Sequence, residues 1–548
     1  MGEYRWLTEL SRQFLERDYL VNGQTVEERV DVICNSAEKI LNKPGFANAF
    51  KNNLKKGWYS LSSPIWSNFG TKRGLPISCF GSMISDDMDS ILYTQSEVGM
   101  MTKYGGGTSA YFGKLRGRGE TITDNGESSG SVHFMQLFET IIQVVSQGSS
   151  RRGQFAAYLP IDHKDINEFL GIRSEGHPLQ DLSFGVCVSD PWMEEMIAGD
   201  AAKRKTWAKV LESRSNKGYP YLFFTDNANK GTVDCYKDQG MEITHSNLCC
   251  EIFLPDSEKE SFVCDLSSMN VLYFDEWKDT DAVELLVYFL DAVMTEFINK
   301  AKNIRFMERP VRFAERHRAL GIGWLGYHSY LQSKMIPFES MEAKYANVAI
   351  AKKIKEDSYK ASAQLAKEYG EPEVLKGYGR RNSTTCAIAP TKSSAFILGQ
   401  VSENTEPNRT NIVIKDLQKG KYTMRNVYLE ELLEKYGKNN DVTWQSILKQ
   451  GGSVQHLTFL SKHEKDVFKT FAEISPKEII IQAAQRQKYI DQGQSINLMI
   501  HPSVPIKDVN ALLIEGWRMG IKSFYYQYSV NAAQEFSRNI LTCSSCES

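Results

Sequence analysis

Cysteine is scarce in this sequence, and neither sign of charge dominates it. Ten cysteines in 548 residues are too few for a disulfide scaffold, and a reducing compartment would keep most of them as thiols. The formal net charge of −2 supplies no strong basic field for nucleic acid or for an anionic membrane surface. We therefore expect neither nucleic acid nor a membrane as a partner.

Long apolar runs, secretory signals and metal-ligand motifs are also missing. Residues 1–6 carry charge where a secretory signal needs an apolar core. The most apolar helical run, 285–298, is interrupted by Asp291 and Glu296 and is too short to span a bilayer. The nine histidines show no HxxxH or HExxH spacing, and the one CxxC pair lies at the C-terminus. These absences predict a cytoplasmic protein that binds no metal.

The sequence does contain a regular alternation of strand-like and helical patterns. Residues 1–60 are predicted to form a helical region, residues 61–530 an α/β body, and residues 531–548 a polar, flexible tail. Helical patterns such as 341–369 alternate with apolar strand-like runs at 182–188, 221–224 and 252–254. This alternation is typical of an α/β architecture with largely parallel strands.

The stretch 246–252, Ser-Asn-Leu-Cys-Cys-Glu-Ile, places polar and ionisable side chains inside an apolar run. Burying such groups costs free energy unless they hydrogen-bond one another or a ligand, which favours a reactive site. The same residues are also consistent with a buried strand whose cysteines act as small hydrophobic residues. On this stretch alone both interpretations stay open.

Several other segments allow a functional and a structural interpretation. The glycines at 105–107 need positive φ or a close backbone approach, but the spacing to Gly113 and Lys114 excludes a phosphate-binding P-loop. The loop 147–154 carries two guanidiniums that either sense a nucleotide or lie in a solvated turn. Residues 389–395 start a helix that either binds a phosphate or has an ordinary N-cap.

Two predicted helices also carry residues of interest. Asp86 and Asp87 supply N-cap carboxylates for a helix that runs through Val98. The apolar stripe from Phe134 to Val145 either packs in the core or forms a dimer surface.

Taken in order along the chain, these motifs resemble the large, catalytic subunit of a class I ribonucleotide reductase. Asn247-x-Cys249-x-Glu251 is similar to the finger loop of that family, and the resemblance runs from about Ser62 to Ser548. It implies a ten-stranded α/β barrel, built from two half-barrels, with the finger loop threaded through its centre. The N-terminal helical region would precede this barrel.

The resemblance implies reduction of ribonucleoside diphosphates to 2′-deoxyribonucleoside diphosphates. Cys249 would become a thiyl radical and abstract the ribose 3′ hydrogen. Glu251 would act as general base on the 3′-OH, and Asn247 would orient the substrate hydroxyls. Cys79 and Cys264 would drive loss of the 2′-OH as water and end as a disulfide, which must be reduced again by thiol exchange.

The resemblance also implies roles for residues outside the reacting group. Radical transfer would use Tyr525 and Tyr526, and Cys543 with Cys546 would shuttle reducing equivalents. The matched positions for binding are, for the substrate, Ser63, Ser78, Gly106, Pro390, Thr391, Ser393 and Ser394, and, for the allosteric specificity site, Asp86, Asp87 and Arg152.

The same resemblance implies the partners. No cofactor would be bound by this chain, because a separate small subunit would generate the radical. Thioredoxin or glutaredoxin would reduce the C-terminal dithiol, and a dNTP or ATP effector would occupy the specificity site of a homodimer.

Two alternatives remain at this point. A cobalamin-dependent reductase also uses thiol pairs, although the adjacent tyrosines favour class I; a requirement for adenosylcobalamin in place of a small subunit separates the two. A non-catalytic, cysteine-rich nucleotide-binding protein is separated by metal analysis and by the activity of a Cys249→Ser variant.

Two features depart from the family pattern. Cys250 places a second thiol beside the proposed radical cysteine, and we expect it to point away because neighbours on an extended segment face opposite sides. Cys79 lies so close to the N-terminus that we expect no ATP-cone domain before it.

The second departure predicts the response to dATP. Without an ATP-cone, high dATP should leave part of the reductase activity in place. A dATP titration of the assay measures this, and complete loss of activity at high dATP would contradict the expectation.

Overall fold

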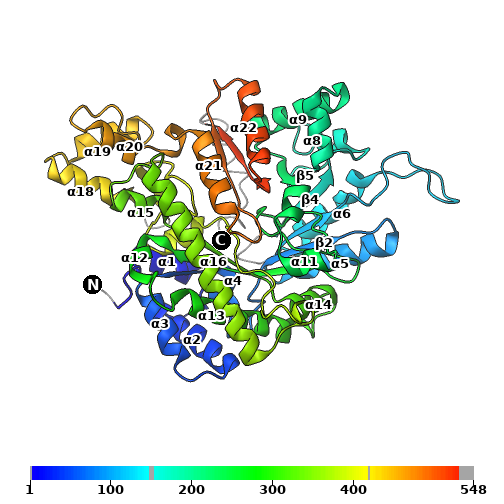
Figure 1. Ribbon diagram of the computed structural model, residues 1–548, viewed down its shortest axis with the longest axis horizontal. Helices are drawn as coiled ribbons and strands as arrows, with labels where there is room; N and C mark the ends of the chain where they lie inside the picture. The colour runs from blue at the N-terminus through cyan, green and yellow to red at the C-terminus, as the bar shows by residue number, and fades with distance from the viewer. Residues whose placement is uncertain (1–2, 22, 147–152, 418–419, 530–548) are drawn as a thin grey trace.

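The structure is a computed structural model that describes residues 3–21, 23–146, 153–417 and 420–529. Its strands pair into a ring, and helices lie around them on the outside (Figure 1). One large hydrophobic core extends from the ring into the N-terminal helices.

Five parallel strands form the first half of the ring. They are hydrogen-bonded in chain order: β2 (Cys79–Met83), β3 (Gly107–Tyr111), β4 (Gln154–Pro160), β5 (Ser183–Val188) and β6 (Tyr221–Phe224). β5 and β6 are buried along their whole length. Burial on both faces is typical of parallel sheets covered by crossover helices and accounts for their largely apolar sequences.

The second half of the ring begins with β7 (Phe262–Asn270) and the parallel β8 (Leu320–Leu325). Bridges Ile322↔Cys386 and Ile388↔Gln494 then add segments 386–388 and 494–500. The last segment, 523–529, contains β12 (Ser523–Phe524) and β13 (Gln527–Ser529), of which β13 pairs with β11 (Leu498–Ile500).

Two antiparallel junctions join the halves, because β7 pairs with β2 and β12 pairs with β6. Counted over the described residues, five segments in each half give the ten-stranded ring that the sequence predicted. The expected α/β barrel is therefore confirmed.

The N-terminal region is helical, as expected. Its elements are α1 (Glu9–Asp18), α2 (Val26–Leu41), α3 (Phe46–Lys55), the short strand β1 (Tyr59–Leu61) and α4 (Ser63–Asn68). β1 pairs with β7, and α2 and α3 pack against the central helix α13. Because these contacts join the region to the barrel, the domain boundaries at residues 60 and 530 stay predictions.

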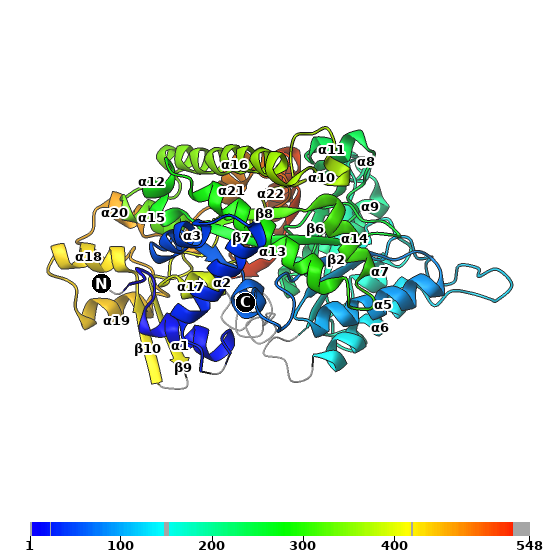
Figure 2. The same ribbon diagram turned by 90° about the horizontal axis from the view of Figure 1, so that it is seen from below.

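The remaining helices surround the barrel or form a projecting lobe. Those around the barrel are α5 (Met88–Lys103), α6 (Ser131–Val145), α7 (Ile166–Phe169), α8 (Asp190–Ala198), α9 (Ala201–Lys217), α10 (Thr225–Lys230), α11 (Asp234–Asp238), α12 (Phe274–Trp277), α13 (Ala282–Ala301), α14 (Glu308–His317), α15 (Tyr327–Ser333), α16 (Met341–Tyr369), α17 (Lys392–Ile397), α21 (Pro476–Gln487) and α22 (Ile506–Arg518). The lobe contains β9 (Ile412–Leu417), β10 (Gly420–Arg425), α18 (Val427–Lys435), α19 (Asp441–Lys449) and α20 (Lys462–Val467). It has a hydrophobic cluster of its own and lies at the opposite end of the molecule from α5 and α6 (Figure 2).

The apolar run 285–298 lies inside α13, whose side chains are largely buried against the barrel. Within the described part of the chain, every helix is too short or too polar to span a bilayer.

Two local predictions were wrong. Residues 252–254 form no strand, because the N–H of Ile252 bonds the Asn247 side chain and that of Phe253 bonds the Gln492 side chain. The run 75–80 also predicts a loop entering a buried strand with Cys79 near its end, whereas Cys79 begins β2 in the structure. The first of these differences shapes the functional site.

A buried arginine attaches the N-terminal helices to the start of the barrel. Arg29 of α2 is 1% exposed. It donates hydrogen bonds to the carbonyl oxygens of Trp66, Ile65 and Phe69 at 2.6–2.8 Å. These carbonyls lie at the end of α4, which begins at Ser63.

Loss of this arginine should therefore destabilise the protein. We expect Arg29→Met to lower the free energy of unfolding by about 3 kcal/mol, because three buried carbonyls lose a charged donor. The half-exposed Arg12, which pairs with Glu27, is the control, and Arg12→Met should cost less than about 1 kcal/mol. Urea denaturation measures both, and equal losses would contradict the anchoring role.

A candidate active site at the centre of the barrel

The segment 246–252 makes a tight turn inside the barrel. The side-chain oxygen of Asn247 accepts the backbone N–H groups of Glu251 and Ile252, both at 3.0 Å. The N–H of Cys250 bonds the Asn247 carbonyl at 3.2 Å, and Cys250 has a φ of +62°. The polar residues of this stretch therefore stabilise the turn.

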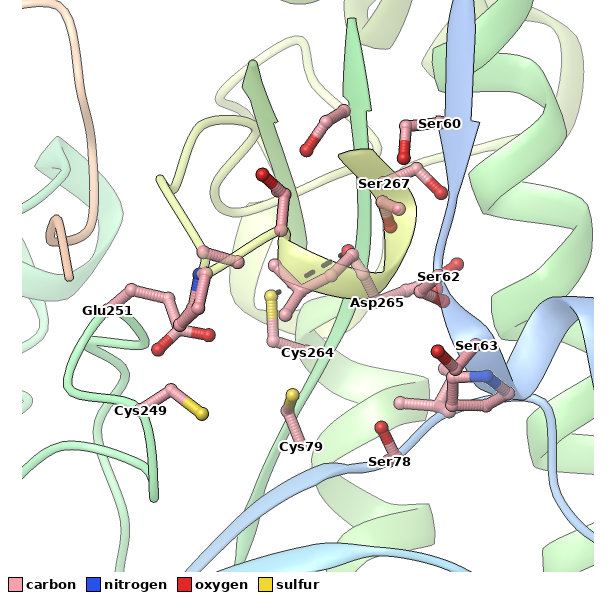
Figure 3. A pocket seen from close by; sticks show the side chains of 18 residues that line it. Ser60, Ser62, Ser63, Ser78, Cys79, Cys249, Glu251, Cys264, Asp265 and Ser267 are labelled. Carbon is pink, nitrogen blue, oxygen red and sulfur yellow. Dashed lines mark hydrogen bonds between the residues drawn. The ribbon is translucent and has the colours of Figure 1, made fainter. Parts of the chain in front are cut away.

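A cavity opens beside this turn, and its empty volume, open solvent included, is about 680 Å³. Cys249 and Glu251 lie on one side of the lining, Ser62, Ser63 and Ser78 lie on the other, and Cys79 and Cys264 lie between them (Figure 3). The lining is completed by Ser60, Pro64, Ile77, Asp265, Leu266, Ser267, Ser268, Ala389, Pro390, Thr391 and Ser394.

Cys79 and Cys264 lie directly opposite each other on the antiparallel strands β2 and β7. Opposite side chains on such strands have Cβ atoms about 4.5–5.5 Å apart, so a modest shift brings the two sulfurs to disulfide distance. Both residues are thiols in this structure. Cys79 is partly exposed, whereas Cys264 is buried.

Cys249 lines the cavity and Cys250 does not. The expected orientation of Cys250 thus agrees with the structure, but the expected cause does not. The segment is a turn and not an extended strand. The left-handed conformation at Cys250 turns its side chain into the core, where it is fully buried.

Glu251 is 1% exposed, and burial raises its pKa from about 4.5 to about 7. Hydrogen bonds from the Asn247 side chain, the backbone and Ser495 lower that pKa in part. The Ser495 hydroxyl lies 3.3 Å from the carboxylate oxygen of Glu251. Glu251 is thus poised to exchange a proton near neutral pH.

Tyr525 and Tyr526 are buried side by side, with ring centroids 4.2 Å apart. The N–H of Tyr525 bonds the carbonyl oxygen of Ile496 at 2.8 Å. The preceding residue, Ser495, donates its hydroxyl to the Cys249 carbonyl at 2.5 Å. A single segment therefore connects the tyrosine pair to the turn that carries Cys249.

The family model described as "Ribonucleotide reductase, barrel domain" matches residues 77–203, 198–376 and 372–527. The chain belongs to the ribonucleotide reductase family. The ribonucleoside-diphosphate reductase large subunit of Invertebrate iridescent virus 3 is 32% identical, over 86% of this chain and 86% of that protein. The large subunit of Danio rerio is 29% identical, over 93% of this chain and 74% of its own length.

Solved structures agree with this assignment. The class Id ribonucleotide reductase alpha subunit of Actinobacillus ureae is 54% identical, with a TM-score of 0.92, over 99% of this chain and 100% of that chain. These similarities confirm the expected enzyme, a class I ribonucleotide reductase large subunit. They favour this enzyme over the cobalamin-dependent and non-catalytic alternatives.

The predicted substrate residues of the reductase divide into two groups. Ser63, Ser78, Pro390, Thr391 and Ser394 line the cavity. The other two, Gly106 and Ser393, do not line it.

Packing explains the glycine at position 106. A Cβ atom there would lie 2.8 Å from the Phe80 ring and 2.9 Å from the Met101 carbonyl oxygen. The absence of a side chain is thus required by close packing, and a role for Gly106 in binding substrate stays a prediction.

The predicted allosteric residues lie apart from the cavity. Asp87 caps α5 by accepting the N–H of Ser90 at 2.7 Å, and Asp86 pairs with Arg116 at 2.7 Å. The capping role of Asp87 is as expected, whereas Asp86 does not cap the helix and accepts the backbone N–H of Arg116 instead. Arg152, Cys543 and Cys546 lie outside the described residues.

Sequence reasoning missed the segment 491–497, Asp-Gln-Gly-Gln-Ser-Ile-Asn. Gln492 contacts Cys264, Ser495 contacts Cys249 and Glu251, and Asn497 accepts the N–H of Tyr526. The sequence signal that could have identified it is a run of polar residues next to an apolar strand. These polar residues are buried in the structure. Buried polar residues of this density need partners, and the partners of Gln492 and Ser495 include the reactive side chains Cys264 and Glu251.

Metal ligands are not gathered anywhere in the described ranges. No group of three or more His, Cys, Asp or Glu residues there is placed to hold a metal ion.

The raised pKa of Glu251 predicts how stability depends on pH. The folded protein binds a proton at Glu251 more tightly than the unfolded chain does. This tighter binding stabilises the folded protein fully below about pH 4.5, and the stabilisation is lost as the pH rises through about 7. Glu251→Gln should remove this dependence. Relative to wild type, the variant should gain about 3 kcal/mol between about pH 4.5 and pH 8.

Denaturation at a series of pH values measures this difference. Glu406 and Asp256, whose pKa values are also raised to about 7, are present in both proteins, so their effects cancel. A difference that stays constant with pH would show that Glu251 is not protonated in the folded state.

Proposed function

We propose that this chain reduces ribonucleoside diphosphates to 2′-deoxyribonucleoside diphosphates by thiyl-radical chemistry in the central cavity. The observation that carries the proposal is that Cys249, Glu251 and the pair Cys79 and Cys264 line one cavity. The relatives named ribonucleoside-diphosphate reductase support the same substrate class.

The arrangement supports a sequence of balanced steps. A thiyl radical at Cys249 takes the 3′ hydrogen atom of the ribose, and Glu251 accepts the proton of the 3′-OH. The 2′-OH leaves as water. Cys79 and Cys264 supply the two electrons and two protons that the reduction needs and become a disulfide. Glu251 returns its proton to the 3′ oxygen, and Cys249 returns the hydrogen atom to C3′.

The pKa of Glu251 suits this role. A base whose pKa lies near the working pH is ionised in a useful fraction of the molecules and can therefore accept a proton. It also releases that proton readily afterwards. Because its pKa is about 7, turnover should rise with pH through the neutral range. Asn247 supports the base through its side-chain hydrogen bond, and substrate orientation by Asn247 remains part of the proposal.

The hydroxyl side of the cavity fits a diphosphate. Ser63 begins α4, and Ser78 directly precedes β2. Thr391 and Ser394 lie at the start of α17. Hydroxyl and backbone N–H groups from separate elements converge there, and such donors bind phosphate oxygens. The ribose would then lie toward the three sulfurs.

The radical enters from a partner. Tyr525 and Tyr526 are adjacent phenols, and the segment they pair with also holds the Cys249 carbonyl. A radical-generating small subunit would oxidise this pair. Cys543 and Cys546, with thioredoxin or glutaredoxin, would reduce the disulfide after each turnover.

Effector binding belongs to the same proposal. Asp86, Asp87 and Arg152 would bind a dNTP or ATP effector in a homodimer. In support, α5 and α6 pack together, and α5 leaves Met88 and Leu92 about half exposed.

The test is a reductase assay with a small subunit, a ribonucleoside diphosphate and a dithiol reductant. Cys249→Ser should lose activity by at least about a thousandfold, because a hydroxyl does not form a comparable radical. Cys250→Ser is the matched control and should retain activity within about threefold, because Cys250 faces the core.

Two outcomes would contradict the proposal. One is full turnover by Cys249→Ser. The other is a loss in Cys250→Ser as large as that in Cys249→Ser, with both proteins folded by circular dichroism.

A further inference from the structure

Gln492 brings an amide group to the sulfur of the buried redox cysteine. Its Nε2 lies 3.3 Å from Sγ of Cys264. Gln492 is fully buried, and Cys264 is 1% exposed. The other hydrogen bond of this sulfur runs to the carbonyl oxygen of Asp265 at 3.8 Å and is drawn as a dashed line in Figure 3.

The surroundings decide which end of the amide faces the sulfur. The Gln492 side-chain oxygen accepts the N–H of Phe253, a group that can only donate, at 3.0 Å. The nitrogen lies 3.0 Å from the carbonyl oxygen of Leu320, a group that can only accept. The amide nitrogen therefore faces Cys264, and its two N–H groups are shared among the Leu320 carbonyl oxygen, the Thr384 hydroxyl oxygen at 3.0 Å and Cys264 Sγ.

The backbone of Gln492 is also fixed. Its N–H bonds the Cys386 carbonyl at 3.2 Å, and its carbonyl oxygen accepts a hydrogen bond from Lys522 at 2.8 Å. These backbone bonds, and the side-chain bonds to Phe253 and Leu320, hold the amide beside the sulfur.

The amide opposes the effect of burial on the thiol. Burial raises the pKa of Cys264 well above its ordinary value, and the Gln492 hydrogen bond lowers it in part. A neutral donor supports a transient thiolate without ionising the resting thiol, which a lysine or arginine at the same place would do.

We propose that Gln492 is a positioning residue that stabilises Cys264 as the leaving thiolate when the Cys79–Cys264 disulfide is reduced. The role rests on the proposed function, which makes this disulfide in each turnover. It assigns different tasks to the two redox cysteines.

Accessibility decides the direction of attack. Cys79 is partly exposed to the cavity, whereas Cys264 is buried. An incoming thiolate of a dithiol forms a bond to Cys79 Sγ, the Cys79–Cys264 bond breaks, and the electron pair stays on Cys264 Sγ. The second thiol of the dithiol then displaces Cys79. The dithiol supplies both electrons, and a better-stabilised leaving thiolate departs faster.

The experiment measures this reduction without turnover. Full-length protein with Cys543→Ser and Cys546→Ser is oxidised with diamide, and dithiothreitol then reduces the disulfide. Alkylation at timed intervals and mass spectrometry give the rate for Cys79 and Cys264. The variants are Gln492→Met and Gln492→Glu, and Gln482→Met is the control, because Gln482 is also fully buried but bonds Phe338 and Tyr327.

The order of the rates separates an electrostatic role from a structural one. We expect Gln492→Met to be reduced about tenfold more slowly than wild type, and Gln492→Glu more slowly still, because a carboxylate repels the leaving thiolate. A purely structural role predicts the reverse, since glutamate keeps the shape of glutamine and its acceptor for Phe253. Gln482→Met should match wild type.

Three results would overturn the role of Gln492. They are an unchanged rate in Gln492→Glu, a larger loss in Gln492→Met than in Gln492→Glu, and failure of diamide to join Cys79 to Cys264 in the parent protein with Cys543→Ser and Cys546→Ser. If Gln492→Met does not fold, Gln492→Glu alone decides. Failure of the proposed function appears instead in the Cys249→Ser assay, which leaves this rate untouched.

Discussion

The turn closed by Asn247 is the constraint on which the rest of the structure depends. Two backbone N–H groups, of Glu251 and Ile252, bond its side-chain oxygen, and the N–H of Gly493 bonds the Glu251 carbonyl at 2.8 Å. These bonds satisfy backbone groups of a polar segment that lies inside an apolar barrel, where unpaired groups would be costly. The turn also directs Cys249 and Glu251 toward the cavity and Cys250 toward the core.

The second half of the barrel supplies the support for this turn. Segment 491–497 is more than two hundred residues away in the sequence, yet it contacts Cys264, the Cys249 carbonyl and the backbone of both tyrosines. Because the groups that would carry the radical and those that would supply electrons share one support, a shift of this segment would disturb both. A closed ring of strands resists such a shift.

Local patterns predicted much of the fold. The helix at 341–369 and the strand at 221–224 agree with the structure, because periodicity and apolar runs are local properties. The prediction that Cys79, Cys249 and Cys264 lie close together came from the resemblance to a family and not from local patterns. Residues 252–254 and Gln492 could not be predicted, because their conformation depends on side-chain bonds between positions 239 and 228 residues apart.

The most direct test is the stoichiometry of one turnover. Reduced protein with Cys543→Ser and Cys546→Ser, mixed with a small subunit and a ribonucleoside diphosphate but no external reductant, should form deoxyribonucleotide and stop. The account predicts one Cys79–Cys264 disulfide for each deoxyribonucleotide, counted by mass spectrometry and chromatography. Deoxyribonucleotide formed while both thiols remain open to alkylation would contradict it.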